Sequence, residues 1–201
     1  MPKFSHEFDP RHPLHIKMKP YFTYLDFHGD LDVTAKQVIK YLFTTGIFDK
    51  PANWMGPVPL EGLWKSAPEL KDWLDTLNLT VENVAVLGYY QSSGIHIDVN
   101  ATPRINFPLH NYKETAITNF YSLTNLQKTA RKDGGVTYWD LAYDSAEIID
   151  SYELTRPVLF DPNIPHSVVF NQALDNKNPR LALSIFFTDP PYHMLKTDNS
   201  L

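Results

Sequence analysis

The sequence predicts a mainly β protein, a double-sheet jelly roll with N-terminal helices packed on the sheet. Residues 1–80 carry helix signals, whereas residues 82–190 carry strand signals almost throughout. About eight short apolar runs in the second part are separated by Pro, Asn, Asp and Gly, a spacing typical of a sandwich or barrel. With 201 residues, of which 43% are apolar and 13% aromatic, the chain is suited to one core. We therefore expect a single domain over residues 1–201.

Two helices are expected in the N-terminal part. Between Asp32 and Gly46 the apolar residues recur at helical spacing, and Gly46 is a suitable C-terminal stop. A second helix is expected after Ser66, because Ser66 and Glu69 have the spacing of a capping box. Its apolar stripe, interpreted as a face that packs on a sheet, consists of Leu70, Trp73, Leu74 and Leu77.

Strands are expected from residue 82 onward. Asp133-Gly134-Gly135 is a tight-turn signal directly before one of them. The loops, where substrate specificity would lie, are expected around residues 100–103, 124–134 and 143–152. The expected strands cover residues 84–90, 94–99, 104–109, 115–123, 136–139, 153–160, 167–170 and 180–187.

Composition excludes several classes of protein. The chain has no cysteine, which excludes disulfides, thiolate metal sites, iron–sulfur clusters and cysteine nucleophiles. Any metal must then be held by His, Asp, Glu or backbone oxygen. The formal net charge of -5 and the absence of a basic stripe argue against nucleic-acid binding. No apolar run has the length of a signal segment or a membrane span, so we expect no membrane partner and a cytoplasmic or other soluble intracellular location.

His96-Ile97-Asp98 is the sharpest local motif. On a strand, residues two apart face the same way, so both polar side chains would project from one face, about 7 Å apart along the backbone. A single metal ion could then bind both. The alternative is a half-exposed strand with polar residues on its solvent face, which is the ordinary pattern of an antiparallel sheet.

Two later residues complete a possible site. His166 begins a strand after a proline-bearing turn, and a third ligand from a distant strand is what a facial triad of two His and one carboxylate requires. Arg180 opens an otherwise apolar strand and shares a face with Ser184. A guanidinium that points into a barrel is costly unless an anion meets it, and a carboxylate fits its fork. Alternatively, Arg180 lies in solvent at the strand mouth or pairs with a structural Asp.

In this order, His96, Asp98, His166 and Arg180 resemble the motif of the iron(II)- and 2-oxoglutarate-dependent oxygenases, whose core is a double-stranded β-helix of the cupin type. The segment 89–98 resembles the approach to the first His in prolyl-hydroxylase-like members, as does Asp133-Gly134-Gly135 before a later strand. The segment 104–109 resembles the aspartyl/asparaginyl β-hydroxylase branch. The resemblance covers about residues 84–190.

Two positions depart from these patterns. Position 182 is Ala where the oxygenases often have Ser, and the serine of this strand is Ser184. Asn106 stands where the β-hydroxylase branch has His, and that branch generally lacks the carboxylate that Asp98 provides. The chain therefore follows neither branch closely, and the substrate of neither can be transferred to it.

The resemblance implies a complete reaction. Iron(II) would be held by the three triad residues, with no further catalytic side chain. 2-Oxoglutarate would place its far carboxylate on Arg180, helped by Ser184 or Tyr90, while Arg104 and Asn106 would contact its C1 carboxylate or the substrate. With O2, the protein would be a dioxygenase that hydroxylates a C–H bond of a small molecule or an amino-acid residue and releases succinate and CO2.

Two other functions stay open. A cupin metalloenzyme that does not use 2-oxoglutarate would keep the metal but would not need Arg180. A non-catalytic jelly-roll binding module would need neither, and its apolar strands and proline-rich loops would serve the fold alone.

Overall fold

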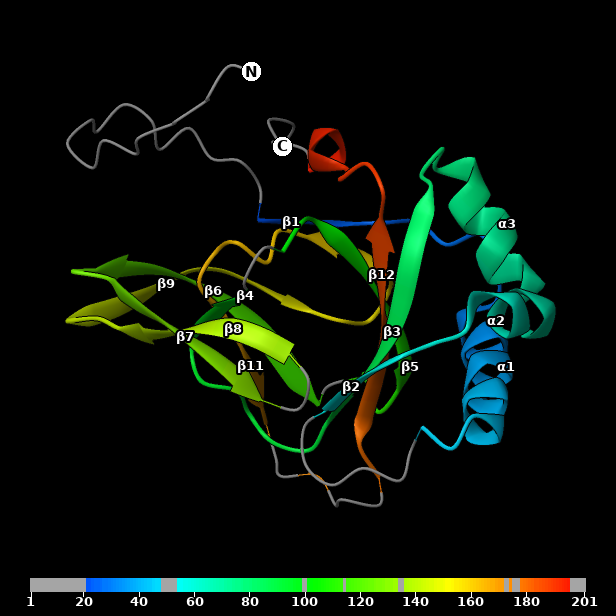
Figure 1. Ribbon diagram of the computed structural model, residues 1–201, viewed down its shortest axis with the longest axis horizontal. Coiled ribbons are helices and arrows are strands. Elements are labelled where there is room, and N and C mark those ends of the chain that lie inside the picture. Colours follow the sequence, from blue (N-terminus) through cyan, green and yellow to red (C-terminus); the bar gives the residue numbers. More distant parts are fainter. Residues whose placement is uncertain are drawn as a thin grey trace.

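The computed structural model describes residues 21–47, 54–98, 101–113, 115–133, 136–171, 174 and 178–195. In these segments the chain is mainly β, with two antiparallel six-stranded sheets compatible with a β-sandwich. Figure 1 shows three layers: the helices, a sheet that they cover, and a second sheet on the far side of the first. We call them the helix layer, the helix-side sheet and the outer sheet.

Each sheet has a strand order that differs from the order along the chain. The helix-side sheet runs β1 (Phe22–Tyr24), β10 (Val158–Phe160), β5 (Arg104–His110), β12 (Arg180–Phe187), β3 (Val81–Tyr89) and β2 (Trp54–Pro57). The outer sheet runs β7 (Gln127–Asp133), β8 (Val136–Ala142), β4 (His96–Asp98), β11 (His166–Phe170), β6 (Ala116–Thr124) and β9 (Ser145–Glu153).

The helix layer is α1 (Leu31–Thr44), α2 (Leu60–Ser66) and α3 (Pro68–Thr76), and a 3-10 turn, η1 (Tyr192–Met194), lies near the C-terminus. Asp30 caps α1, because its side chain accepts a hydrogen bond from the Val33 amide at 3.0 Å. Gly46, with φ of 66°, follows the end of this helix in the left-handed conformation that glycine tolerates. The buried faces of the helices pack on the helix-side sheet through Ala35, Val38, Leu42, Leu63, Leu70, Trp73 and Leu74.

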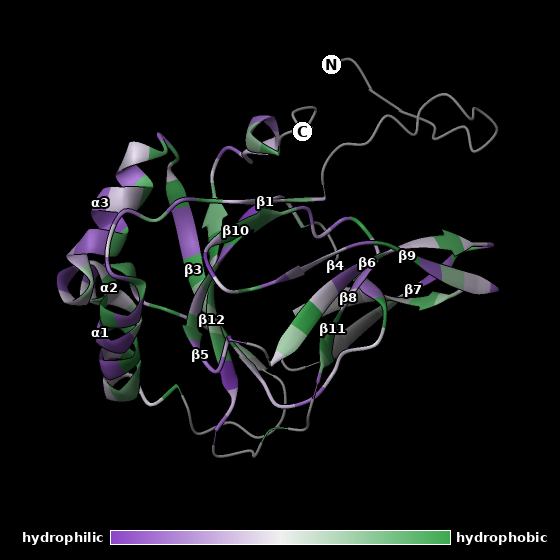
Figure 2. Cartoon of the chain, turned by 180° about the vertical axis from the view of Figure 1, so that it is seen from behind, coloured by the Kyte–Doolittle hydropathy of each residue, from purple (hydrophilic) through white to green (hydrophobic). Residues whose placement is uncertain are grey.

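Strand alternation divides the helix-side sheet into two faces. On β12, Leu181, Leu183 and Ile185 belong to the core formed with the helices. The alternate residues face the other way, and Ala182 packs in a smaller cluster that includes Phe120 of the outer sheet. Figure 2 shows that β3 has a hydrophilic stretch near its start, beside α3. The inner face of this sheet meets the outer sheet, and it carries the buried polar side chains of Arg180 and Ser184.

Several sequence-based expectations are corrected. Ser66 ends α2 instead of capping a helix, and α3 begins at Pro68, which has no amide proton and suits a first helical position. The region 153–160 contains the end of β9 and the short β10 instead of one strand. The expected loops at 124–134 and 143–152 largely form β7 and β9. The glycines Gly134 and Gly135 lie outside the described residues, but Asp133 pairs with Val136 across them.

In the described segments no helix is long and apolar enough to cross a bilayer.

The loop after β5 is tied to α1 by a hydrogen bond that depends on pH. Tyr112 Oη donates to Asp32 Oδ1 at 2.5 Å, and Lys113 Nζ lies 3.6 Å from Asp32 Oδ2. The Tyr112 hydrogen bond is the main reason why the pKa of Asp32 is below its ordinary value, with Lys113 second. Because the folded pKa is depressed, this stabilisation is complete above about pH 4, the unfolded value, and is lost as the pH falls through the folded pKa.

Replacing Tyr112 with Phe is therefore expected to raise the pKa of Asp32 toward its ordinary value. The variant should have a lower free energy of unfolding than the original protein at neutral pH. This difference should shrink over roughly one pH unit as the pH falls below about 4. Carboxyl NMR titration and urea unfolding at several pH values measure both effects. Tyr41→Phe is the matched control, because Tyr41 Oη donates to the Pro59 carbonyl at 3.1 Å, which does not titrate. Equal pH profiles for the two variants would contradict the assignment.

Candidate metal centre between the sheets

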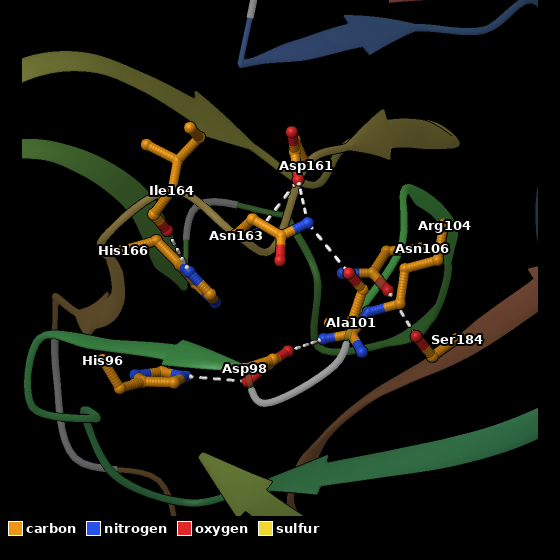
Figure 3. Close-up of polar contacts among 10 residues, drawn as sticks. All are labelled: His96, Asp98, Ala101, Arg104, Asn106, Asp161, Asn163, Ile164, His166 and Ser184. Atoms are coloured by element: carbon orange, nitrogen blue, oxygen red, sulfur yellow. Dashed lines mark hydrogen bonds and ion pairs between the residues drawn. The ribbon is translucent and has the colours of Figure 1, made fainter. Parts of the chain in front are cut away.

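Two neighbouring strands of the outer sheet carry the three candidate ligands. His96 and Asp98 lie on one face of β4, and Ile97 between them is buried on the other. His166 begins β11 and is the direct cross-strand partner of His96. Directly opposed residues of an antiparallel pair project from the same face, and the two imidazole centroids are 4.4 Å apart. One ligand atom from each of the three residues lies within 4.8 Å of the others, and Figure 3 shows them converging.

Backbone hydrogen bonds orient both imidazole rings. His96 Nδ1 is 2.8 Å from the Gly94 carbonyl oxygen, and His166 Nδ1 is 2.8 Å from that of Ile164. Because a carbonyl oxygen only accepts, each Nδ1 carries the proton of its hydrogen bond, and Nε2 is the ring nitrogen left to face an ion. His96 Nε2 is 3.7 Å from Asp98 Oδ1. Metal-binding histidines are oriented in this way, with the second ring nitrogen bonded to a carbonyl or carboxylate.

The protonation states of the buried ligands suit a divalent cation. Burial lowers the pKa of His166 to about 3, so its ring is neutral at physiological pH. Burial alone would raise the pKa of Asp98, but the charges around it, with the Arg104 guanidinium the strongest, outweigh burial, and the net pKa lies below the ordinary value. Asp98 is therefore an ionised carboxylate. A metal ion needs neutral imidazole and ionised carboxylate, and both are present before it binds.

Arg104 connects the helix-side sheet to the candidate ligands. It is the first residue of β5, and a terminal nitrogen of its guanidinium donates to Asp98 Oδ2. The guanidinium also lies over two aromatic rings, 5.2 Å from the centroid of Phe160 and 5.3 Å from that of Phe186. Arg104 was expected to contact a cosubstrate or substrate, and its contact in the structure is the Asp98 carboxylate.

Arg180 is a buried cation on the same inner face. Its Nε has no hydrogen-bond partner, and within the described segments no acidic side chain pairs with it. Burial lowers its pKa, while Tyr152 and Tyr89 act in the opposite direction. Burial also raises the pKa of both tyrosines, so their hydroxyls stay protonated. A guanidinium without an anion beside two phenol donors is an arrangement that can receive a carboxylate.

Polar side chains continue from Arg180 toward the three candidate ligands. By strand register, Ser184 lies opposite Asn106, and Asn106 is two residues from Arg104 on β5. Ser184 Oγ donates to Asn106 Oδ1 at 3.1 Å, as drawn in Figure 3. The Tyr152 hydroxyl is hydrogen-bonded with Thr118 and Asn106. The inner faces of the two sheets thus hold a row of polar groups with a cation near each end.

One predicted contact is wrong. Tyr90 was expected to help hold a cosubstrate, but its side chain is buried in the core formed with the helices. The preceding residue, Tyr89, is the cross-strand partner of Arg180 and faces the inner side. Sequence reasoning also missed Tyr152 and Thr118. Tyr152 lies on β9, where a loop was expected, and the β-branched and aromatic residues of the segment 148–152 were the signal that could have found it.

The structure brings seven of the sequence-based candidates to the facing sides of the two sheets. They are His96, Asp98, His166, Arg104, Asn106, Ser184 and Arg180. No protein-family model matches this chain, and no curated protein matches its sequence.

Proposed function

We propose that the protein is an iron(II)- and 2-oxoglutarate-dependent dioxygenase that hydroxylates a C–H bond of a small molecule or an amino-acid residue. The observation that carries the proposal is the joint presence, on facing sheets, of a converging His, Asp and His set and a buried guanidinium, that of Arg180, with no acidic partner among the described residues. A metal site alone would fit many enzymes. The buried Arg180, whose Nε has no hydrogen-bond partner, adds the need for an anion, and 2-oxoglutarate is an anion that also chelates metal.

We infer further that the fold is a double-stranded β-helix. The support is that successive strands alternate between the sheets: β3, β5, β10 and β12 belong to the helix-side sheet, and β4, β6, β9 and β11 to the outer sheet. The hairpin of β7 and β8, which follows β6 along the chain, extends the outer sheet beyond β4. In a fold of this kind the space between the sheets is lined by both, as the candidate site requires.

The donor set fits iron(II) in a two-His-one-carboxylate site. His96 and His166 would bind through Nε2, and Asp98 through the oxygen that faces His96. A set of this kind occupies one face of an octahedron and leaves three positions open, which is the arrangement of non-haem iron oxygenases. Bound iron(II) supplies the redox chemistry in which O2 and 2-oxoglutarate give succinate and CO2 while one oxygen atom enters the substrate C–H bond.

The remaining residues of the site bind and orient. Arg180 would hold the far carboxylate of 2-oxoglutarate through its guanidinium, with Tyr89 and Tyr152 as neutral hydroxyl donors nearby. The hydrogen bond from Ser184 to Asn106 Oδ1 fixes that amide, whose NH2 group is left for the hydrogen bond with the Tyr152 hydroxyl. Apolar residues such as Phe120 and Phe160 exclude water around the metal ligands, which strengthens each electrostatic contact.

Anaerobic addition of iron(II) and 2-oxoglutarate to the metal-free protein tests the proposal. We expect a weak charge-transfer band toward the red end of the visible spectrum, and slow succinate formation when air is admitted. Metal binding without a response to 2-oxoglutarate would indicate a cupin metalloenzyme of another kind. A protein that binds no metal and forms no succinate would be the non-catalytic module, and the dioxygenase proposal would be abandoned.

A further inference from the structure

Arg104 is a buried charge paired with another buried charge, that of Asp98, and such a pair is unusual for a residue that only stabilises the fold. Its side chain has 12% exposure and that of Asp98 7%, so both charges are largely removed from water. The desolvation of such a pair often exceeds its Coulombic gain, and an apolar pair of similar volume is commonly as stable. In addition, Arg104 Nε is buried and has no hydrogen-bond partner. Stability alone therefore does not account for a cation at this position.

The two oxygens of Asp98 are divided between two directions. Oδ2 accepts from the Arg104 guanidinium, whereas Oδ1 faces His96 Nε2 at 3.7 Å. Figure 3 shows this division, with His96 on one side of the carboxylate and Arg104 on the other. The rings of Phe160 and Phe186 lie against the guanidinium and hold it in place by cation–π contact. Only one oxygen of Asp98 thus remains for a metal ion.

The number of ligand atoms determines how many positions stay open. An octahedral ion with two Nε2 atoms and one carboxylate oxygen keeps three open positions. If both oxygens of Asp98 bound, only two would remain. A chelating 2-oxo acid needs two positions and O2 needs a third, so a bidentate Asp98 would leave the site one position short.

We propose that Arg104 is a positioning residue that keeps Asp98 monodentate and so preserves the third open position at the metal. This inference rests on the proposed metal site and concerns Arg104 itself, which need not touch the metal or the cosubstrate. It has a consequence that distinguishes it from general support of the site. Without Arg104 the ion should bind no more weakly, because a nearby cation is removed and a second oxygen becomes available. The chelating cosubstrate should bind more weakly.

The test uses Co2+ as a spectroscopic probe and N-oxalylglycine, the unreactive analogue of 2-oxoglutarate. For Arg104→Met we expect a Co2+ dissociation constant equal to that of the original protein or up to about tenfold lower. We expect N-oxalylglycine to bind the Co2+ form at least about tenfold more weakly, with a smaller change in the visible spectrum. Arg104→Lys should restore binding only in part, because an ammonium can replace the single donor contact but not the stacking of the guanidinium on two rings.

Folding and specificity need separate controls. Removing one partner of a buried pair destabilises the metal-free fold, so Arg104→Gln, whose neutral amide can still donate to Asp98, is measured in parallel. If Arg104→Met fails to fold, an intermediate loss of analogue binding in Arg104→Gln is the expected result. Arg156→Met is the matched control. Arg156 also combines a carboxylate, Asp26 at 3.3 Å, with a ring, Tyr24 at 4.5 Å, but it is half exposed and should behave as the original protein.

Several outcomes would overturn the inference. If the folded Arg104 variants bind N-oxalylglycine as tightly as the original, Arg104 does not preserve an open position. If Arg104→Met loses Co2+ as completely as His96→Ala does, Arg104 assembles the site and does not set the denticity of Asp98. Failure of the original protein to bind Co2+ through His96 would instead remove the proposed metal site, and with it both proposals.

Discussion

Replacing His166 with alanine is expected to abolish stable metal binding and to reduce 2-oxoglutarate turnover by more than about 100-fold, the upper range for loss of a residue that only supports a ligand. His166 is buried, its pKa of about 3 keeps the ring neutral, and Ile164 holds its Nδ1. No other imidazole in the described segments lies within reach to replace it, since the converging set contains three residues only. Iron content after anaerobic loading and succinate formation measure the two losses.

His193→Ala is the control for this prediction. His193 lies exposed on η1, away from the facing sides of the sheets, and its replacement should leave both readouts unchanged. The His166 variant also loses buried volume, so circular dichroism must show that its sheets are retained. Iron content equal to that of the original protein in a folded His166→Ala variant would exclude this residue as a ligand.

Replacing Arg180 with leucine is expected to act in opposite directions on stability and on cosubstrate binding. The metal-free protein should melt at the same temperature or higher, because a buried guanidinium whose Nε has no partner is replaced by an apolar side chain. The affinity for 2-oxoglutarate should fall by roughly 30-fold or more, since loss of one partner of a buried charge pair costs about 2 kcal/mol or more and about 1.4 kcal/mol is tenfold.

Thermal melting and titration of the Co2+ form with N-oxalylglycine measure these two effects. Arg156→Leu removes an exposed arginine that pairs with Asp26, and it should change neither the affinity nor, beyond a few degrees, the melting temperature. Co2+ affinity should be retained in Arg180→Leu, because Arg180 is not among the converging ligands. An unchanged affinity for the analogue would mean that Arg180 does not receive the cosubstrate carboxylate.

The sequence predicted the class of fold better than its connections. The apolar alternation of β12 and β5 was visible because each buries one face against the helices, which makes the pattern strong. β7 and β9 were expected as loops because their residues are mostly exposed, so no buried face marks them as strands. The spacing of Ser66 and Glu69 predicted an N-terminal cap, but α3 begins at Pro68 and Ser66 is the last residue of α2. A local motif does not show to which of two adjoining helices its residues belong.

The candidate site shows the same division. His96, Asp98 and His166 were found because two of them form a local motif and the third follows a turn at a strand start. Tyr90 was chosen in place of Tyr89 because the sequence gives alternation but not the register between β3 and β12, and that register decides which tyrosine meets Arg180. The contact between Arg104 and Asp98 was not predicted, because it joins strands of different sheets and depends on how the sheets face each other.

The direct pairing of His96 with His166 links metal chemistry to strand registration. β4 has three residues, so few backbone hydrogen bonds specify its alignment with β11. A slip of one residue would turn one imidazole to the opposite face and separate the two nitrogens. An ion that binds both imidazole nitrogens therefore favours one alignment of β4 with β11. The stabilisation grows with the logarithm of the ratio of the ion concentration to its dissociation constant. A bound ion would then hold β4 and β11 of the outer sheet in one register. Metal-free protein should therefore exchange the amide protons of β4 faster than metal-loaded protein.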